Sequence, residues 1–170
     1  ITFVDLGTGS GAIGIALAMA NPKWIGLATD IDKNAIEIAS RNFKKNSDQS
    51  NLKFFLGNWW SPLKNFKGEI DLAIANPPYI PKSTYNKLPK EVKNFEPSKA
   101  LLGGEDGLEH IKQIVKSASM YLKEKAFLLI ENHFDQGDRV KQLFLENKFT
   151  SVKVLKDFSG IGRFTIGRYK

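Results

Sequence analysis

The sequence has no cysteine and only two histidines, His110 and His133. The absence of cysteine excludes disulfide bonds and thiolate metal sites, and two histidines are too few for a histidine-rich metal site, so we expect no metal. The sequence also lacks a signal-peptide pattern and a hydrophobic run long enough to span a bilayer. These absences predict a cytoplasmic protein without a membrane partner.

The residues that are present are typical of a globular protein. The chain has 170 residues, enough for one domain with a core, and 42% of them are hydrophobic and 25% charged. The formal net charge is +7. Such a balance suits an acidic partner such as nucleic acid or a ribonucleoprotein, but solvated helix surfaces account for it equally well. We expect a monomer, and contact with nucleic acid stays open.

Apolar periodicity along the chain alternates between strand and helix patterns. The expected strands cover residues 1–6, 24–29, 52–56, 70–75, 126–131, 152–155 and 164–169, and the expected helices cover 12–20, 33–45, 108–122 and 136–146. Strands that alternate with helices imply a mostly parallel sheet, whereas the last two strands have no helix between them and must be antiparallel. The sequence therefore predicts an α/β fold: a Rossmann-like, seven-stranded, mostly parallel sheet with helices on both faces and an antiparallel strand near one edge.

One long interruption, residues 76–107, separates the fourth strand from the next helix. It contains Pro81, Pro89 and Pro97, closes with the glycine-rich run 103–107, and has room for a short helix within 85–95. A loop of this length in a compact domain is unusual and often functional. We expect it to recognise the substrate.

The interruption opens with Asn76-Pro77-Pro78-Tyr79, directly after a buried strand. Two consecutive prolines cannot continue a central strand because they donate no backbone hydrogen bonds. The chain must therefore leave the sheet at its carboxyl edge, where open α/β sheets bind ligands. An amide beside an aromatic ring can hold a planar NH2 group in a fixed pose. A proline-rich turn that merely ends a strand is the simpler alternative.

A glycine turn between the first strand and the first helix is the candidate cofactor site. Its residues are Asp5, Gly7, Thr8, Gly9, Ser10 and Gly11. Glycine lets the backbone approach a ligand and adopt a positive φ, and the helix N-terminus offers free N–H groups. Asp30, which closes the second strand, can accept hydrogen bonds from ribose hydroxyls. The pattern indicates a cofactor that contains ribose.

Two cofactors fit this turn, and Asp5 helps to distinguish them. Gly7, Gly9 and Ala12 also match the dinucleotide pattern of an oxidoreductase, but a dinucleotide would bring its pyrophosphate near the Asp5 carboxylate. S-adenosylmethionine (AdoMet) carries an ammonium and a sulfonium with only one carboxylate, and it tolerates an acid there. We therefore expect AdoMet. The alternative for Asp5 is a side chain satisfied by N–H groups of the turn itself.

The third strand is followed by Gly57-Asn58-Trp59-Trp60, which adjoins the adenine end of such a site. The Asn58 side chain can accept a hydrogen bond from an adenine amino group, and Trp59 can flank the base. Alternatively, both tryptophans belong to the core or to a lid. We adopt that interpretation for Trp60 and not for Trp59.

The glycine turn, the strand-end Asp30 and the Asn-Pro-Pro-Tyr run together resemble class I AdoMet-dependent methyltransferases that act on NH2 groups. Further blocks are similar to the release-factor glutamine N5-methyltransferases: residues 76–81, 96–101 and 103–108, Glu131 with 135–137, and 157–160 with Arg163. The resemblance covers essentially all 170 residues. It implies that residues 1–170 are an AdoMet-dependent catalytic domain that methylates a glutamine side-chain amide in a peptide chain release factor.

For an amide substrate, each residue of the turn receives a role. The Asn76 side-chain oxygen and the Pro77 carbonyl accept the two N–H bonds of the glutamine and turn its nitrogen toward the AdoMet methyl, so that Asn76 belongs to the cofactor site as well. Tyr79 packs on the amide plane, and Pro78 completes the substrate-binding turn. No general base is required, because the methylated amide is acidic enough to lose its proton afterwards.

Four polar residues receive structural interpretations. We interpret His110 and His133 as polar residues of a helix or loop rather than as bases. Glu105 and Asp106 are expected to cap the helix that begins near residue 108.

The sequence departs from the family in three places. Asn58 stands where the family usually has an acid, and Glu124-Lys125 stands where it usually has a Gly-Gly turn. The family's N-terminal helical domain, which helps to grip the release factor, is absent. Because Ile1 falls within an apolar strand, we expect the chain to be a piece of a longer protein.

Other substrates stay open, because the Asn-Pro-Pro-Tyr run alone does not separate protein methylation from DNA or RNA methylation. A glutamine of a ribosomal protein is one alternative, and N6 of adenine or N2 of guanine in a nucleic acid is another. A nucleotide-binding module without chemistry is disfavoured because residues 76–79 are intact.

Overall fold

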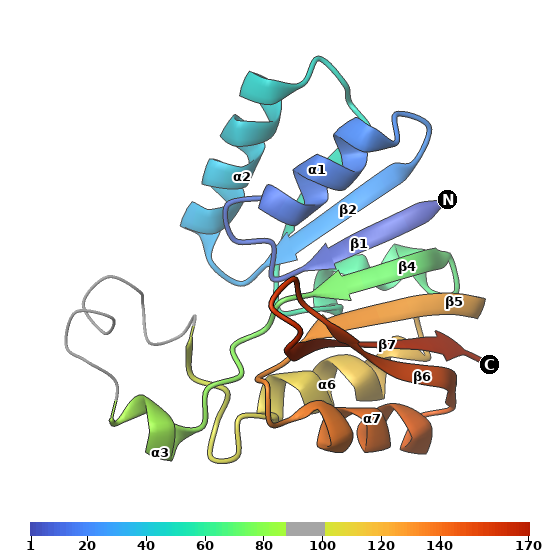
Figure 1. Cartoon of the computed structure of the whole chain (residues 1–170). Coiled ribbons are helices and arrows are strands. Elements are labelled where there is room, and N and C mark those ends of the chain that lie inside the picture. The colour runs from blue at the N-terminus through green and yellow to red at the C-terminus, as the bar shows by residue number, and fades with distance from the viewer. Residues whose placement is uncertain (88–100) are drawn as a thin grey trace.

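The computed structural model describes residues 1–87 and 101–170, and a single seven-stranded sheet forms its centre (Figure 1). The strands follow the order β3-β2-β1-β4-β5-β7-β6. Their bounds are β1 Thr2–Leu6, β2 Ile25–Asp30, β3 Leu52–Leu56, β4 Ile70–Ala75, β5 Leu122–Glu131, β6 Phe149–Lys156 and β7 Gly162–Tyr169. Strands β1 to β5 pair in parallel, and β7 is antiparallel to both β5 and β6. The predicted fold class is confirmed.

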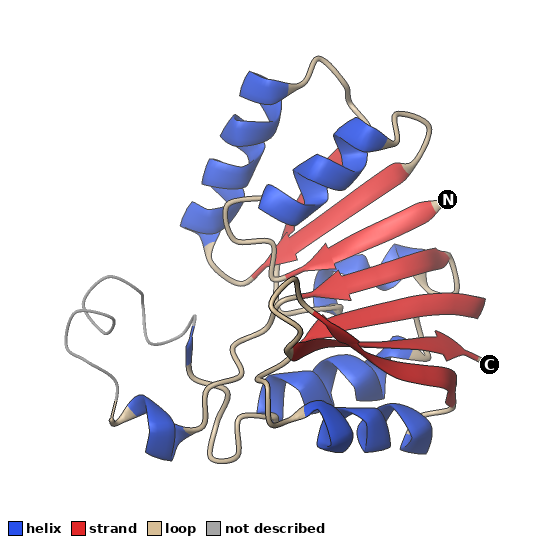
Figure 2. Cartoon of the chain, in the orientation of Figure 1, coloured by secondary structure: helices blue, strands red, loops and turns tan. Residues whose placement is uncertain are grey.

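Helices cover both faces of the sheet (Figure 2). Their bounds are α1 Ala12–Ala20, α2 Lys33–Asn46, the 3-10 helix η1 Ser61–Phe66, α3 Lys82–Tyr85, α6 Glu109–Ala118 and α7 Gly137–Glu146. The strand β1 separates the two layers, because successive side chains of a strand point to opposite faces. Phe3 packs with α1 and α2, whereas Val4 and Leu6 pack in the cluster that α6 and α7 complete.

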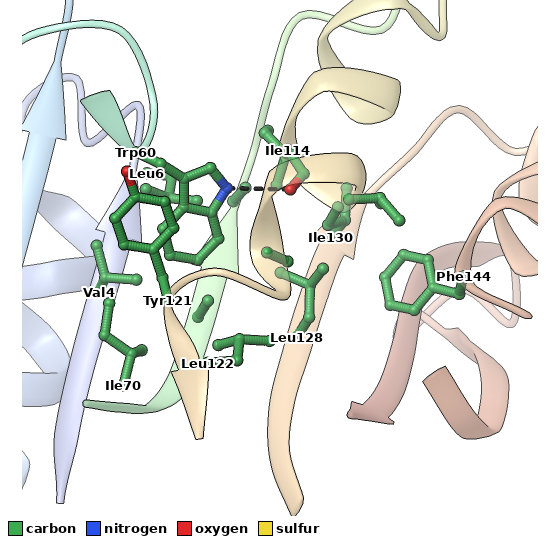
Figure 3. Close-up of a cluster of buried hydrophobic side chains, with 14 of the residues drawn as sticks. Val4, Leu6, Trp60, Ile70, Ile114, Tyr121, Leu122, Leu128, Ile130 and Phe144 are labelled. Carbon is green, nitrogen blue, oxygen red and sulfur yellow. Dashed lines mark hydrogen bonds between the residues drawn. The ribbon is translucent and has the colours of Figure 1, made fainter. Parts of the chain in front are cut away.

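The larger of the two clusters contains an aromatic pair that joins η1 to the other half of the fold (Figure 3). Trp60 stacks on Tyr121 with ring centroids 5.0 Å apart, and its indole Nε1 donates to the Ile114 carbonyl of α6 at 3.0 Å. Both rings are buried, and a buried indole N–H needs such a partner. Trp60 is therefore a core residue, as predicted.

The junction between α6 and β5 differs from the prediction. The apolar pattern predicts a helix over 108–122, but α6 ends at Ala118 and β5 already begins at Leu122. Tyr121 and Leu122 fit the helical period, yet the sheet and Trp60 bury them instead. Tertiary packing overrides the local pattern here.

The Glu124-Lys125 departure lies inside β5 rather than before it. Lys125 has φ 67, and the pairing of β5 with β4 shifts register between Ile70 and Leu72. This irregularity lies where the resemblance leads us to expect a Gly-Gly turn, and positive φ strains a residue with a Cβ.

Other boundaries shift by smaller amounts. β6 runs from Phe149 to Lys156, longer than the predicted 152–155, and η1 has no counterpart among the predicted elements. The short helix expected within 85–95 lies largely outside the described residues, and α3 comes just before it. Within the described parts of the chain, no helix has both the length and the apolar character needed to cross a bilayer.

Candidate active site

The carboxyl ends of four neighbouring parallel strands bring the predicted site residues to one edge of the sheet. Leu6 of β1 pairs with Thr29 of β2 on one side and with Ala75 of β4 on the other, while Asp30 pairs with Leu56 of β3. The glycine turn, Asp30, the Asn58 segment and the Asn76 turn all begin at these positions. The fold thus brings together side chains that are spread along the sequence from Asp5 to Tyr79.

The glycine turn after β1 needs glycine at three positions. Gly7, Gly9 and Gly11 have φ values of 74, 56 and 86, in the left-handed region where a Cβ is strained. The amides of Gly7 and Thr8 both donate to the Thr29 carbonyl, at 2.8 and 2.9 Å. A Cβ on Gly9 would meet no atom within 4 Å, so the turn faces open space at its centre.

Asp5 lies beneath this turn and is almost completely buried. Its Oδ2 accepts from the Thr8 hydroxyl at 2.6 Å and from the Gly14 amide of α1 at 2.9 Å. Burial raises the pKa of Asp5, the nearby Asp30 charge adds to the rise, and the two hydrogen bonds oppose it. These bonds correspond to the alternative weighed for Asp5, a side chain satisfied by the turn and its helix; direct contact with a cofactor stays a prediction.

Asp30 links the glycine turn to the start of α2. Its Oδ2 accepts from the Gly9 amide at 2.8 Å and its Oδ1 accepts from the Asp32 amide at 2.9 Å. The residue is half-buried, and each oxygen of an ionised carboxylate can accept a further hydrogen bond. The position suits a partner for ribose hydroxyls, which remains a prediction.

The Asn58-Trp59 segment follows β3 and leads to the same turn. Trp59 has φ 46, and a Cβ on Gly7 would lie 2.8 Å from its Cζ3, so the indole packs directly on the turn. The indole also meets the His110 ring edge-on, with centroids 5.6 Å apart. Asn58 is exposed beside it. The sequence pattern does not predict the contact between the Trp59 indole and the glycine turn.

The chain leaves β4 at the Asn76 turn, where the side-chain amide of Asn76 is exposed to solvent. Ala75 is buried, Asn76 is exposed and Pro77 is buried again. Among the described residues, no hydrogen bond to the Asn76 side chain is present, so its amide is available at the edge. The Tyr79 hydroxyl donates to Glu131 at the end of β5 at 3.3 Å, which holds the phenol ring in place.

The end of the long loop returns to this turn and clamps it. The Ile80 amide donates to the Leu101 carbonyl at 3.0 Å, and the Gly103 amide donates to the Ile80 carbonyl at 2.8 Å. A Cβ on Gly103 would lie 2.8 Å from the Pro78 carbonyl oxygen, and a Cβ on Gly107 would collide with the Tyr79 carbonyl oxygen. Glycine at these two positions lets the two backbones approach each other.

Gln136 adds a third support from the loop before α7. Its Nε2 donates to the Tyr79 carbonyl at 3.0 Å, while its Oε1 accepts from the His133 amide at 2.9 Å. Gln136 is buried, and both the oxygen and the nitrogen of its side-chain amide are engaged in these bonds. It therefore fixes the backbone of the Asn76 turn relative to β5.

Asp106 organises the start of α6. It accepts from the Leu108 amide at 3.0 Å and from Lys112 and Arg139 at 2.8 Å each. The Lys112 ammonium first, then the Leu108 amide and Arg139, lower the pKa of Asp106 against the effect of burial. Asp106 thus supports the helix start, in keeping with the capping interpretation, whereas Glu105 pairs with Lys82 of α3 at 2.7 Å.

The two histidines have structural surroundings. His110 lies in α6 against Trp59, and His133 lies 2.6 Å from Asp135 with its ring 4.3 Å from that of Phe134. Both fit the interpretation as polar residues of a helix and a loop. In the described part of the chain, no group of three or more His, Asp or Glu side chains could hold a metal ion.

Sequence reasoning missed what Glu131, Gln136, Gly103 and Gly107 do. All four belong to blocks that carry the family resemblance. The expectation that the long loop recognises the substrate includes Gly103 and Gly107, but the spacing does not predict their contacts with the Asn76 turn. The available signal was that these blocks are polar or glycine-rich and fall in loops at the carboxyl edge. Such positions are more often functional than positions in the core.

Comparison with known proteins places the chain in a family. The model of the methyltransferase small domain matches residues 2–92. Release factor glutamine methyltransferase of Prochlorococcus marinus is 40% identical over 162 residues, which cover 95% of this chain and 55% of that protein. Those of Aquifex aeolicus and Bacillus subtilis are 38% and 37% identical and cover 96% and 94% of the chain. The chain spans little more than half the length of these curated relatives.

Solved structures show the same fold at lower identity. A ribosomal protein L11 methylase from Lactobacillus delbrueckii is 21% identical with a TM-score of 0.70, and the match covers 99% of this chain and 70% of that one. The catalytic domain of human Mettl16 bound to an RNA hairpin is 17% identical with a TM-score of 0.72, and the match covers 99% and 63%. At such identities the similarity concerns the fold alone.

Proposed function

The chain belongs to the methyltransferase small-domain family, and we propose that it transfers a methyl group from AdoMet to the side-chain amide nitrogen (N5) of a glutamine in a peptide chain release factor. Residues 1–170 are then the catalytic domain. The relatives named above are release factor glutamine methyltransferases, and the similarity extends over nearly the whole chain.

The observation that carries the proposal is the build of the Asn76 turn. It displays an exposed amide at the end of β4, and its backbone is clamped by Gly103, Gly107 and Gln136. A clamp of this kind costs conformational freedom that a simple connecting loop does not need to lose. It suits a group that must hold a planar amide in one orientation.

A glutamine nitrogen is a poor nucleophile because its lone pair is delocalised into the carbonyl. The Asn76 side-chain oxygen and the Pro77 carbonyl would accept its two N–H bonds and stabilise the positive charge that grows on nitrogen. With AdoMet held by the glycine turn and Asp30, the nitrogen would take up the methyl group, and the electron pair of the broken carbon–sulfur bond would stay with the sulfur. The protonated amide then loses its proton to water. Tyr79, held by Glu131, would pack on the amide plane.

The residues of the glycine turn fit AdoMet, which would supply an electrophilic methyl on a sulfonium. The turn offers an open centre at Gly9, and the carboxylate of the half-buried Asp30 can accept further hydrogen bonds from ribose hydroxyls. Asn58 is exposed where an adenine amino group would need an acceptor, and Trp59 lies beside it. The residues assigned to the cofactor are Asp5, Gly7, Thr8, Gly9, Ser10, Gly11, Asp30, Asn58, Trp59 and Asn76.

The charges near the Asn76 turn favour a protein substrate over a nucleic acid. Glu131 is the last residue of β5, Asp135 comes shortly after it, and Asp157 follows β6. Arg163, at the same edge, is paired with Asp157 at 2.8 Å. A phosphate backbone binds to groups of free cations, whereas the loops of residues 132–136 and 157–161 contain carboxylates and no lysine or arginine. A release factor also fits a cytoplasmic enzyme that acts as a monomer.

The test is methyl transfer from labelled AdoMet to a purified release factor, a ribosomal protein, duplex DNA and RNA, each offered separately. We expect label in the release factor, on the glutamine nitrogen as located by mass spectrometry. Label in DNA or RNA alone would overturn the proposal, and label in the ribosomal protein alone would keep the chemistry but change the substrate.

A further inference from the structure

The loop between β6 and β7, residues 157–161, is held rigidly and yet displays a fully exposed aromatic side chain. Asp157 Oδ1 accepts from the amides of Ser159 and Ile161 at 2.9 and 3.0 Å, and its Oδ2 accepts from Arg163 Nε at 2.8 Å. The Asp157 amide donates to the Ile161 carbonyl at 2.8 Å. Between these anchors, the Phe158 side chain has no cover at all.

The sheet topology places this loop at the same end of the sheet as the Asn76 turn. β7 is antiparallel to both β5 and β6, so β6 ends at the same edge as β4 and β5 (Figure 1). The Asn132 amide, just after β5, donates to the Arg163 carbonyl at 2.8 Å, and Glu131 pairs with Phe164 across the strands. Since Glu131 also binds Tyr79, a continuous set of contacts joins the loop to the turn that holds the methyl acceptor.

Phe158 is not an isolated exposed residue. Ile161 of the same loop is 40% exposed, and Phe134, in the loop that leaves β5, is 60% exposed. Single exposed apolar side chains need no explanation, but here three lie on two loops at the same end of the sheet as the Asn76 turn. The proposed methyl transfer uses neither Asp157 nor Arg163, so this surface is available for a different role.

We infer that loop 157–161 is a docking element for the polypeptide that carries the methyl-accepting glutamine, with Phe158 packing against an apolar side chain of that polypeptide. The inference rests on the function proposed above. A polypeptide suits the surface better than a nucleic acid, because Arg163 is engaged by Asp157, and Glu131 at the end of β5 and Asp135 in the loop after it are carboxylates. An aromatic ring that stacks on bases works together with free cations.

The state of Asp157 supports a loop that is formed before the substrate arrives. The Ile161 amide first, and then Arg163 and the Ser159 amide, lower the pKa of Asp157 against the effect of burial. The carboxylate is therefore ionised at neutral pH and keeps its hydrogen bonds. A loop that is already ordered loses little entropy when a partner binds to it.

The experiment compares Phe158→Ala with Leu145→Ala in the 170-residue chain. Leu145 is also exposed, at 48%, but lies near the C-terminal end of α7, at the opposite edge of the sheet. For methylation of an intact release factor, we expect Phe158→Ala to raise KM about tenfold or more with kcat nearly unchanged, the scale for an aromatic ring that is no longer buried. Leu145→Ala should match the wild type, and AdoMet affinity by calorimetry should be equal in all three.

A cross-linking experiment identifies the partner without relying on turnover. A photoreactive benzoylphenylalanine replaces Phe158, and the protein is illuminated with the release factor, duplex DNA or RNA. We expect an adduct with the release factor. An adduct with nucleic acid alone would overturn the inference, as would a KM of Phe158→Ala equal to that of Leu145→Ala in an active enzyme. If the wild type methylates no protein, the proposed function fails first and the docking role fails with it.

Discussion

The turn after β1 and the turn after β4 lie at the same edge of the sheet but are held in different ways. The first is held largely from nearby: Asp5 binds Thr8 and Gly14, and Asp30 binds Gly9 and Asp32. The second is held by residues far along the chain. Tyr79 is bound by Glu131 and Gln136, 52 and 57 positions away.

The difference follows from what each turn would bind. A cofactor with a constant structure would need one fixed turn shape, which glycines and two carboxylates near the ends of β1 and β2 can set. On the proposed function, a polypeptide acceptor would have to be aligned with the cofactor from the opposite side, and elements that could also contact the polypeptide would position its turn. The two turns should therefore respond separately to mutation.

The largest effect is expected at the exposed amide of the second turn. Asn76→Ala should reduce methyl transfer by about 10²-fold or more, because it removes one preorganised acceptor, while most AdoMet affinity remains. Asn76→Asp keeps an acceptor and the shape, so it should retain more activity than Ala or at least keep AdoMet bound. Single-turnover kinetics and calorimetry measure the two quantities. Wild-type rates in both variants would reduce Asn76 to a residue that ends a strand.

The clamp on the second turn provides the next test. Gly107 has φ 75, and a Cβ there would collide with the Tyr79 carbonyl and with Gln136, so Gly107→Ala should displace the turn and cut methyl transfer by about tenfold or more. Gly68→Ala is the matched control, because Gly68 has φ 69 but open space around it. The control should lose only about 1 kcal/mol of stability and no activity. Equal losses in both variants would mean that strain, and not the clamp, matters.

The same contrast explains what the sequence reveals. The glycine turn, Asp30 and the Asn76 run are recognisable because each is a short pattern at the end of an apolar strand. Contacts such as Tyr79 with Glu131 join segments 52 residues apart, and no spacing rule predicts them. Trp59 is similar, because its contact with Gly7 depends on a positive φ at a bulky residue, which local preference disfavours.

Element boundaries failed where packing outweighed the local pattern. The apolar period of 108–122 continues through Tyr121, but Tyr121 lies outside α6, where its ring stacks on Trp60 and Leu122 pairs with Ile70 of β4. By contrast, α1 begins and ends where the glycine turn and Asn21-Pro22 predict. Where the local signals were strong, the predicted helix ends were correct. Where contacts between distant residues decided the boundary, the prediction was wrong.

In the first turn, Asp30→Ala should weaken AdoMet binding about tenfold, the scale for a lost hydrogen bond to a charged group. Asp32→Ala is the control, since Asp32 accepts from the Asn34 amide at the start of α2 and does not contact the glycine turn through its side chain. The control should lose about 1 kcal/mol of stability as a lost N-cap, with AdoMet affinity unchanged. Calorimetry and urea unfolding separate the two effects. Equal affinity in both variants would contradict the role of Asp30.

Asp5 offers a test of the first turn by pH. An acid whose pKa is higher in the folded than in the unfolded protein binds more protons when folded, so the free energy of unfolding falls as pH rises from about 3.9 through the raised folded pKa. Asp5→Asn can still accept both bonds, because Thr8 and Gly14 share one oxygen. Urea unfolding from pH 4 to 7 should show a smaller decline for the variant. Parallel curves would mean that Asp5 does not titrate in this range.

Asp106 and Asp157 should not obscure that result. Their pKa values are lowered in the folded protein, so the stability they contribute is present above the unfolded value and is lost only as pH falls through their folded pKa. Their effect therefore lies at the acid side of the window in which Asp5 is measured.

The smallest effect is expected away from both turns, at Lys125 in the irregular part of β5. Lys125 has φ 67 and an exposed side chain, so Lys125→Gly should raise the free energy of unfolding by about 0.5–1 kcal/mol by removing the strain of a Cβ in the left-handed region. Lys153→Gly, at an exposed position of β6 without positive φ, should lower it by a similar amount.

Neither substitution touches the glycine turn or the Asn76 turn, so AdoMet affinity and methyl transfer should both stay at wild-type values. A Lys125→Gly variant that lost activity would show that the bulge in β5 helps to place Glu131, and the second turn would then depend on a still more distant part of the chain.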